Sequence, residues 1–259
     1  MATFKITLAY DGTEFVGWQR QATGTSIQGL LEGALGELDG RKVTVTGAGR
    51  TDAGVHALGQ VASCSIERSI ASGQLVGALN ARLPVDVRVL SAAEVPPTFH
   101  ARFDARAKTY RYRIWNADVV SPFERRYAWH VDAALDVGAM NAAARLLEGR
   151  HDFAAFRAAG SAARTTDRMV IASRVDRRDR LVVYEITGDG FLRYMVRAIV
   201  GTLVEIGRGR QPPEWMGDVL GARDRARAGP TAPPEGLFLV RVDYGGPGKV
   251  PLKADTTGV

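Results

Sequence analysis

The sequence is poor in cysteine, in lysine and in long apolar runs. Its single cysteine, Cys64, cannot form a disulfide within the chain, and its apolar surroundings suit a small buried hydrophobe. No apolar run approaches the ~20 residues that a membrane-spanning helix requires. The N-terminal residues 1–11 read as a strand and lack the basic and apolar regions of a secretory signal, so we expect a cytoplasmic protein without a membrane anchor.

The sequence also has little that could bind a metal or a nucleotide cofactor. The four histidines are scattered along the chain, and none has a cysteine or histidine partner at a spacing typical of metal ligands. No glycine-rich phosphate loop of the Walker type is present. We therefore expect neither a metal site nor nucleotide hydrolysis.

Positive charge is abundant and is carried mainly by arginine. The formal net charge is +6 and the pI is about 9.7. Only five of the 34 basic residues are lysines. Arginine binds phosphate through a planar fork and stacks on bases, so the composition favours a nucleic-acid partner. A coding bias toward arginine would give the same composition.

Hydrophobic periodicity divides the 259 residues into two halves that share one order of elements. In the first half it predicts helices at 26–39 and 70–82, and strands at 3–10, around Val43 and Val45, at 59–67 and at 86–94. In the second half it predicts helices at 136–148 and 191–206, a short helix near 213–222, and strands at 108–114, 168–176, 180–188 and 237–244. Each half reads β-α-β-β-α-β, the split βαβ or ferredoxin-like order.

This order predicts an α+β fold of two ferredoxin-like units. Each unit would have an antiparallel sheet with helices on one face, and a cleft between the units would be free for a ligand. The first unit covers residues 1–104 and the second covers 105–246. The tail at 247–259 contains Gly, Pro and Lys with little periodicity, and we expect it to be disordered.

The most informative segment runs from Gly47 to Ala57 and reads GAGRTDAGVHA. Glycines on both sides of Asp52 free the backbone for tight or left-handed turns, which can present a carboxylate to a ligand. Arg50, two residues away, would help to keep that carboxylate ionised. A polar turn between two strands would have the same composition.

A second candidate lies in the helix predicted at 191–206. Arg193 and Arg197 are four residues apart and therefore lie on one side of the helix. Arg197 has strongly apolar neighbours, and a partly buried arginine needs an anionic partner. Asp52, Glu205 or a phosphate group could serve as that partner.

The strand predicted at 108–114 alternates aromatic and basic side chains. Tyr110 and Tyr112 share one face, and Arg111 and Arg113 share the other. An amphipathic strand with aromatic core contacts explains this pattern, and we favour that interpretation for Tyr112. The functional alternative is an aromatic surface on which bases stack, with arginines near the phosphates.

These segments together resemble the tRNA pseudouridine synthase A family. The specific motif is Gly-Arg-Thr-Asp-Ala-Gly-Val-His-Ala at 49–57. The supporting motifs are YDGTEF at 10–15, GWQ at 17–19, FHARF at 99–103, KTYRY at 108–112, HDF at 151–153, the segment 191–201 and EGL at 235–237. The resemblance spans residues 3–244 in the order that the family has.

The resemblance implies a function and a set of site residues. The family isomerises uridine to pseudouridine at positions 38–40 of the tRNA anticodon stem-loop, works as a homodimer and needs no cofactor. Asp52 looks like the nucleophile, and Arg50 would help to displace the target base. Tyr110 would pack against the uracil and contact the sugar or Asp52, and Arg197 would pair with Asp52.

The chemistry is consistent with these residues. The reaction breaks the N1–C1′ bond, turns the uracil and rejoins it through C5, so nothing is oxidised and no water is consumed. Asp52 could attack C1′, abstract a proton from C2′ or attack C6 of the uracil, and the sequence leaves all three routes open. Each needs an ionised carboxylate; burial would raise the pKa of Asp52, and pairing with Arg197 would lower it again.

Two other functions stay open at this point. A non-catalytic RNA-binding protein would suit the basic composition and the tyrosine strand, but it has no use for a glycine-flanked aspartate facing anionic RNA. A glycosidase-like hydrolase usually needs two carboxylates, and no second acidic residue lies near Asp52 in the sequence.

Overall fold

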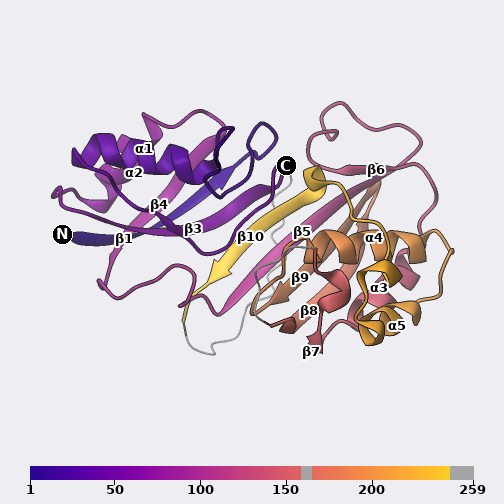
Figure 1. Cartoon of the computed structure of the whole chain (residues 1–259). Coiled ribbons are helices and arrows are strands. Elements are labelled where there is room, and N and C mark those ends of the chain that lie inside the picture. The colour runs from indigo at the N-terminus through magenta and orange to yellow at the C-terminus, as the bar shows by residue number, and fades with distance from the viewer. Residues whose placement is uncertain (159–164, 246–259) are drawn as a thin grey trace.

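The computed structural model describes residues 1–158 and 165–245, and their first half is built on the strand β1 (Ala2–Tyr10). Alternate residues of β1 are apolar and buried on one face, as the period of a half-buried strand requires. β1 pairs in antiparallel fashion with β3 (His56–Ile66) and with β4 (Val87–Val95). The helices α1 (Ile27–Asp39) and α2 (Ser72–Asn80) contact each other and contribute buried leucines to the same core (Figure 1).

The second half repeats this arrangement around the strand β5 (Ala107–Asn116). β5 pairs in antiparallel fashion with β9 (Leu181–Gly188), β9 pairs with β8 (Asp167–Arg178), and β8 pairs with the short β7 (Gly149–Asp152). The three-residue strand β6 (Trp129–Val131) runs parallel to β5. The helices of this half are α3 (Val137–Arg145), α4 (Met195–Gly207) and α5 (Trp215–Ala222), with 3-10 turns at Ala154–Phe156, Arg225–Arg227 and Pro234–Gly236.

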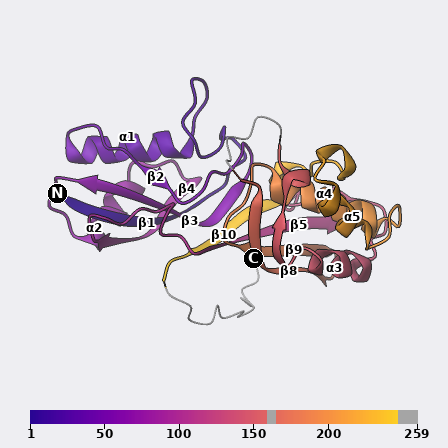
Figure 2. The same ribbon diagram turned by 60° about the horizontal axis from the view of Figure 1, so that its bottom comes forward.

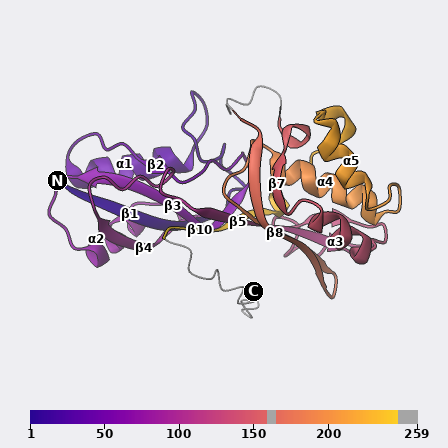
Figure 3. The ribbon, with the colours of Figure 1, turned by 90° about the horizontal axis from the view of Figure 1, so that it is seen from below.

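The strand β10 (Leu237–Asp243) joins the two halves into one sheet. It runs parallel to β3, with Phe238 opposite His56, and antiparallel to β5, with Leu239 opposite Tyr110. The strand order is β4-β1-β3-β10-β5-β9-β8-β7. The turned views show the helices of each half at opposite ends of this sheet (Figure 2, Figure 3).

The predicted α+β class and the repeated element order are therefore confirmed, but the two sheets are continuous rather than separate. Periodicity reveals which residues share a face of a strand, but it says nothing about which strands become neighbours. β10 has strand partners on both edges at Phe238 and Leu239, and this is where the two halves are joined.

Local signals explain where the helix α1 begins and ends. The side chain of Ser26 accepts a hydrogen bond from the N–H of Gly29 at 3.2 Å, which caps the first turn. Gly40 follows the last turn with φ +71°, the left-handed conformation that ends helices. The helix predicted at 26–39 is thereby confirmed.

The strand expected around Val43 and Val45 was placed too early. The paired residues form β2 (Thr46–Gly47), and both valines are buried just before it. The backbone of Val45 instead meets side chains of α1, because its N–H donates to Glu32 at 3.1 Å and its C=O accepts from Gln28 at 2.9 Å. With both groups satisfied in this way, Val45 needs no partner strand.

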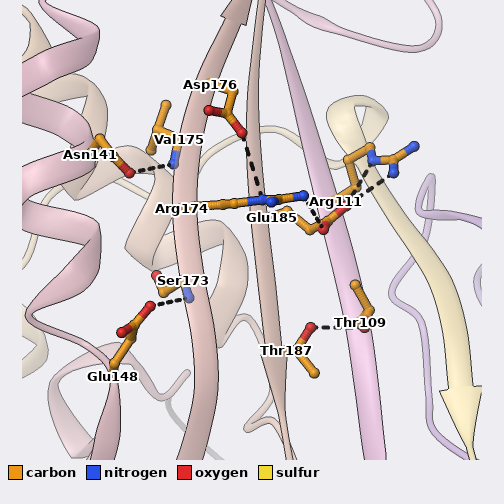
Figure 4. Close-up of polar contacts among 10 residues, drawn as sticks. All are labelled: Thr109, Arg111, Asn141, Glu148, Ser173, Arg174, Val175, Asp176, Glu185 and Thr187. Atoms are coloured by element: carbon orange, nitrogen blue, oxygen red, sulfur yellow. Dashed lines mark hydrogen bonds and ion pairs between the residues drawn. The ribbon is translucent and has the colours of Figure 1, made fainter. Parts of the chain in front are cut away.

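Charged side chains pair across three neighbouring strands of the second half (Figure 4). Glu185 in β9 lies opposite both Arg111 in β5 and Arg174 in β8, and it forms ion pairs with them at 3.0 and 3.1 Å. Asp176 extends the row with a contact to Arg174 at 3.6 Å. Cross-strand pairs of opposite charge favour one register, and this register sets the position of Tyr110.

Side chains from the α3 region cover the part of β8 that extends beyond β7. The side chain of Asn141 accepts a hydrogen bond from the N–H of Val175, and that of Glu148 accepts one from the N–H of Ser173, both at 3.0 Å (Figure 4). These contacts satisfy backbone groups that a bare edge strand would expose.

The tail predicted to be disordered at 247–259 lies outside the described residues. Within 1–158 and 165–245, no helix combines the length and the apolar character needed to cross a membrane.

Candidate active site

Asp52 begins a tight turn between β2 and β3. The N–H of Val55 donates to the backbone oxygen of Asp52 at 3.1 Å, and Gly54 has φ +75°. A left-handed third residue in such a turn favours glycine, as the sequence predicted. The turn leaves the side chain of Asp52 24% exposed.

Hydrogen bonds from core residues fix the segment that precedes Asp52. The hydroxyl groups of Thr51 and Tyr10 are 2.8 Å apart, and the N–H of Trp18 donates to the backbone oxygen of Thr51 at 3.0 Å. The side-chain amide of Gln60 donates to the backbone oxygen of Gly49 at 3.0 Å. Because Thr51, Tyr10 and Gln60 are buried, these contacts hold the loop from its core side.

His56 fixes the other end of the same loop, a role that the sequence analysis missed. Its Nδ1 accepts a hydrogen bond from the N–H of Gly12 at 3.0 Å, and its Nε2 lies 3.1 Å from the backbone oxygens of Arg126 and Glu235. Its ring stacks on Phe238 with centroids 4.7 Å apart. Burial lowers the pKa of His56, and the net direction stays downward although Oδ1 of Asp11, 3.1 Å from Nδ1, raises it.

Gly17 touches the Asp52 loop where a side chain would not fit. Its φ is +102°, and a Cβ there would lie 2.6 Å from the backbone oxygen of Thr51. We expect Gly17→Ala to lower the free energy of unfolding by about 2 kcal/mol and to lower activity by about 100-fold, because the loop must move. Denaturant unfolding and a pseudouridine-formation assay would measure the two effects.

Gly33 is the matched control for this substitution. It is exposed in the middle of α1, and a Cβ there meets nothing within 4 Å. Gly33→Ala should raise the free energy of unfolding by about 0.5–1 kcal/mol and leave activity unchanged. A Gly17→Ala protein as active and as stable as the unmodified protein would show that the loop tolerates displacement.

Asp52 and Arg197 form the central ion pair of the site. Nη1 of Arg197 lies 3.7 Å from Oδ2 of Asp52. Burial raises the pKa of Asp52, while the positive charges of Arg197 and then Arg193 lower it, and the net result is a pKa above the usual 3.8. Of the partners that the sequence allowed for Arg197, the structure places Asp52 beside it.

Arg197 is itself held by two further contacts. Its Nε donates to the backbone oxygen of Ala232 at 2.7 Å, and its guanidinium carbon lies 4.8 Å from the ring centroid of Tyr194. Arg193 lies 4.9 Å from the same ring centroid. Tyr194 has φ +63°, so α4 begins at Met195 rather than at the predicted residue 191. This left-handed tyrosine lies between the two cations of the site.

Tyr110 faces the site from the sheet. It is buried, and its pKa is raised by burial first and then by the charges of Tyr10 and Asp52. Its ring meets the ring of Phe191 edge to face, with centroids 4.9 Å apart. Tyr112 is fully buried and donates a hydrogen bond to the backbone oxygen of Pro233 at 2.7 Å, which confirms its interpretation as a core residue.

Arg50 lies on the same loop but is not among the charges that shift the pKa of Asp52. Its side chain is exposed. The cations that lower the pKa of Asp52 are Arg197 and then Arg193.

Asp11 is the acidic residue beneath this loop, and its carboxylate already has partners. It accepts hydrogen bonds from the N–H and the hydroxyl of Thr13 and, at 2.7 Å, from the hydroxyl of Tyr127. These bonds lower the pKa of Asp11 overall although burial raises it. In the described part of the chain, no group of three His, Cys, Asp or Glu side chains is placed to hold a metal ion.

Known proteins resemble this chain over most of its length. A family model described as tRNA pseudouridine synthase matches residues 6–104 and 143–245. The curated protein named tRNA pseudouridine synthase A from Moorella thermoacetica is 50% identical over 246 residues, covering 94% of this chain and 100% of its own. Those of Pelobacter propionicus and Myxococcus xanthus are each 48% identical and cover 94% and 97% of this chain, and 100% and 96% of their own.

The two matched segments of the family model include Asp52 and Arg197, and Tyr110 lies in the stretch between them. The relatives align with this chain over almost its whole length. The chain belongs to the tRNA pseudouridine synthase family.

Proposed function

We propose that this enzyme isomerises uridine to pseudouridine at positions 38–40 of the tRNA anticodon stem-loop, with Asp52 as the catalytic residue. The observation that carries the proposal is the ion pair of Arg197 with Asp52 at 3.7 Å, next to which the hydroxyl of Tyr110 reaches the Asp52 loop, 3.8 Å from where a Cβ on Gly49 would be. The family to which the chain belongs and the printed names of its relatives support the reaction and the tRNA substrate.

Asp52 acts in its ionised form. Its carboxylate attacks C1′, takes a proton from C2′ or attacks C6 of the uracil, and each route needs a free electron pair on oxygen. The N1–C1′ bond breaks, the uracil turns, and a C5–C1′ bond forms. The hydrogen on C5 leaves as a proton and N1 gains one, so the isomerisation is balanced without an oxidant. Arg197 keeps enough Asp52 ionised despite the burial that raises its pKa.

Tyr110 and Arg50 contact the substrate in this proposal. The ring of Tyr110 packs against the uracil, which its place beside Asp52 and its edge contact with Phe191 support. Arg50 helps to displace the target base from the stem. Its exposure, two residues before Asp52, supports that role. Extruding a paired base costs a few kcal/mol, and arginine contacts to the phosphates supply it.

We further infer that residues 1–104 and 105–246 act as two units of one site, because the first supplies Asp52 and the second supplies Tyr110 and Arg197. We also infer a homodimer, on the family resemblance. We infer a cytoplasmic location because the single cysteine, Cys64, is buried and free. Light scattering coupled to size-exclusion chromatography would measure the oligomeric state.

A tritium-release assay on tRNA labelled at C5 of its uracils tests the proposed reaction. The proposal expects label in water and pseudouridine in the tRNA, with no free uracil. A non-catalytic RNA-binding protein would bind the tRNA and release no tritium at any enzyme concentration. A glycosidase-like hydrolase would release free uracil. Either of those two results would overturn the proposed function.

A further inference from the structure

Lys108 lies beside the Asp52 loop, although none of the proposed steps uses it. It is two residues before Tyr110 in β5, so the two side chains share a face of the strand. A Cβ built on Gly49 would lie 3.5 Å from Cε of Lys108 and 3.8 Å from the hydroxyl of Tyr110. The end of the Lys108 side chain therefore reaches the segment that leads into Asp52.

The charges around Lys108 are mainly positive. Burial lowers the pKa of Lys108, the charges of Arg102 and Arg168 lower it further, and that of Asp189 raises it. None of the ion pairs formed within residues 1–158 and 165–245 includes Lys108. Like charges gathered around a half-buried ammonium group are costly for the protein alone and favour an anionic ligand.

Arg102 projects from a rigid turn. The N–H of Asp104 donates to the backbone oxygen of His100 at 3.1 Å. Nδ1 of His100 accepts from the N–H groups of Arg102 and Phe103, both at 3.2 Å. The ring of His100 stacks on that of Phe103 with centroids 4.2 Å apart. Because its backbone is fixed in this way, binding a ligand would order only the exposed side chain of Arg102 and not the turn that carries it.

Arg168, in β8, is the second arginine whose charge acts on Lys108. Its hydrogen bonds to Thr165 and to the backbone oxygen of Asp167 all come from Nη1. Its Nε lies 3.3 Å from where a Cβ on Gly190 would be, so the guanidinium lies along the loop between β9 and α4. The counter-charge Asp189 is already engaged, because it accepts a hydrogen bond from the N–H of Met169 at 3.0 Å.

We propose that Lys108, Arg102 and Arg168 form a subsite for a phosphodiester group of the RNA, next to the nucleotide that meets Asp52. The inference rests on the proposed function for the identity of the substrate. A nucleic-acid strand carries one phosphate every few ångströms, so a sugar placed at Asp52 brings backbone phosphates to the neighbouring side chains. Lysine binds a phosphate as a point charge, and arginine binds it through a planar fork.

The subsite would also offset the repulsion between the Asp52 carboxylate and the RNA backbone. The carboxylate of Asp52 repels the phosphates that flank the target nucleotide. Arg197 and Arg193 offset this repulsion on the α4 side. Lys108, Arg102 and Arg168 would offset it on the sheet side, where Tyr110 lies, so that the strand is held from both sides of the reacting sugar.

Binding of tRNA by Lys108→Met tests this subsite. Methionine keeps much of the apolar stem and removes the charge. The dissociation constant would be measured in an Asp52→Asn background, which prevents turnover, at several salt concentrations between about 50 and 200 mM. We expect binding about tenfold weaker and a salt slope reduced by about one. In the otherwise unmodified enzyme the KM should rise while kcat stays within a few-fold.

Two matched variants separate a phosphate contact from a structural role. Lys108→Arg keeps the charge and should restore binding to within about threefold and the salt slope in full. Lys42→Met removes an exposed lysine on the loop before β2 and should change neither quantity. Weaker binding by Lys108→Met with an unchanged salt slope would overturn the subsite in favour of a structural role, and an unchanged dissociation constant would also overturn it.

Tritium release by the unmodified enzyme, measured in parallel, keeps the two proposals apart. Release together with a Lys108→Met salt slope equal to that of the unmodified chain would overturn the subsite alone. No release together with a reduced slope would support the subsite and overturn the proposed function.

Discussion

Replacing Asp52 with asparagine should reduce pseudouridine formation by about a thousandfold or more while the dissociation constant for tRNA stays within a few-fold. The substitution keeps the size and the turn geometry, but it replaces a carboxylate by a neutral amide, whose oxygen is too weak a base and nucleophile for any of the three routes. Losses of this size are usual when the central catalytic group of an enzyme is removed. Single-turnover assays with excess enzyme and labelled tRNA would measure the rate without interference from product release.

The fold should not suffer from Asp52→Asn, for a reason that follows from the pKa of Asp52. Burial raises this pKa above 3.8, so the native state binds the proton more tightly than the unfolded chain does. Stability from this group is therefore full below the unfolded pKa and is lost as the pH rises through the folded pKa. At neutral pH a neutral asparagine avoids that loss, and denaturant unfolding should show equal or higher stability.

Asp176→Asn is the matched control for this loss of charge. Asp176 is 61% exposed and pairs with Arg174 on β8. Exposed pairs of this kind contribute little to stability, so both activity and stability should be unchanged. An Asp52→Asn enzyme that modifies tRNA at the unmodified rate would remove Asp52 from the mechanism.

Removing the charge of Arg197 should have the second largest effect. Arg197→Met leaves Asp52 half-buried without its main cation, so more of the carboxylate is protonated and the transition state loses a nearby charge. We expect a loss of about 100-fold to 1000-fold in the single-turnover rate. Arg197→Lys keeps the charge but loses the planar donor to Ala232, and its activity should be intermediate.

Arg210→Met, just beyond the C-terminal end of α4, serves as the control for Arg197→Met. Arg210 follows α4, is 61% exposed and pairs with Glu205 at 2.9 Å, away from Asp52. Its removal should leave the rate unchanged. A rate for Arg197→Met as high as that for Arg210→Met would show that the ion pair with Asp52 has no part in the reaction.

Much of the fold follows from local sequence signals. The helix α1 has its cap at Ser26 and its stop at Gly40, and the strand β1 has unbroken alternation, so both are readable without a structure. The start of α4 is not, because nothing in the residue type of Tyr194 signals a left-handed conformation. The single continuous sheet is also beyond local reasoning, since β10 finds its two partners far away in the chain.

The candidate site was predictable only where local sequence signals reveal it. The glycines around Asp52 indicated a presented carboxylate, and helical spacing with apolar neighbours indicated that Arg197 needs an anion. The cation beside Asp52 depends on tertiary structure, because Arg197 comes from a distant part of the chain and proximity in the sequence does not reveal it. Lys108 could have been found, because period-two alternation places it on the same face as Tyr110.

The most direct test of the account is the pH dependence of the single-turnover rate with saturating enzyme. Asp52 must be ionised to react, so the rate should fall on the acid side through the pKa of Asp52, which lies above 3.8. Because Arg197 lowers this pKa, the acid limb of Arg197→Met should move to higher pH. An acid limb at the same pH in both proteins would contradict the claim that an arginine-held Asp52 carboxylate starts the reaction.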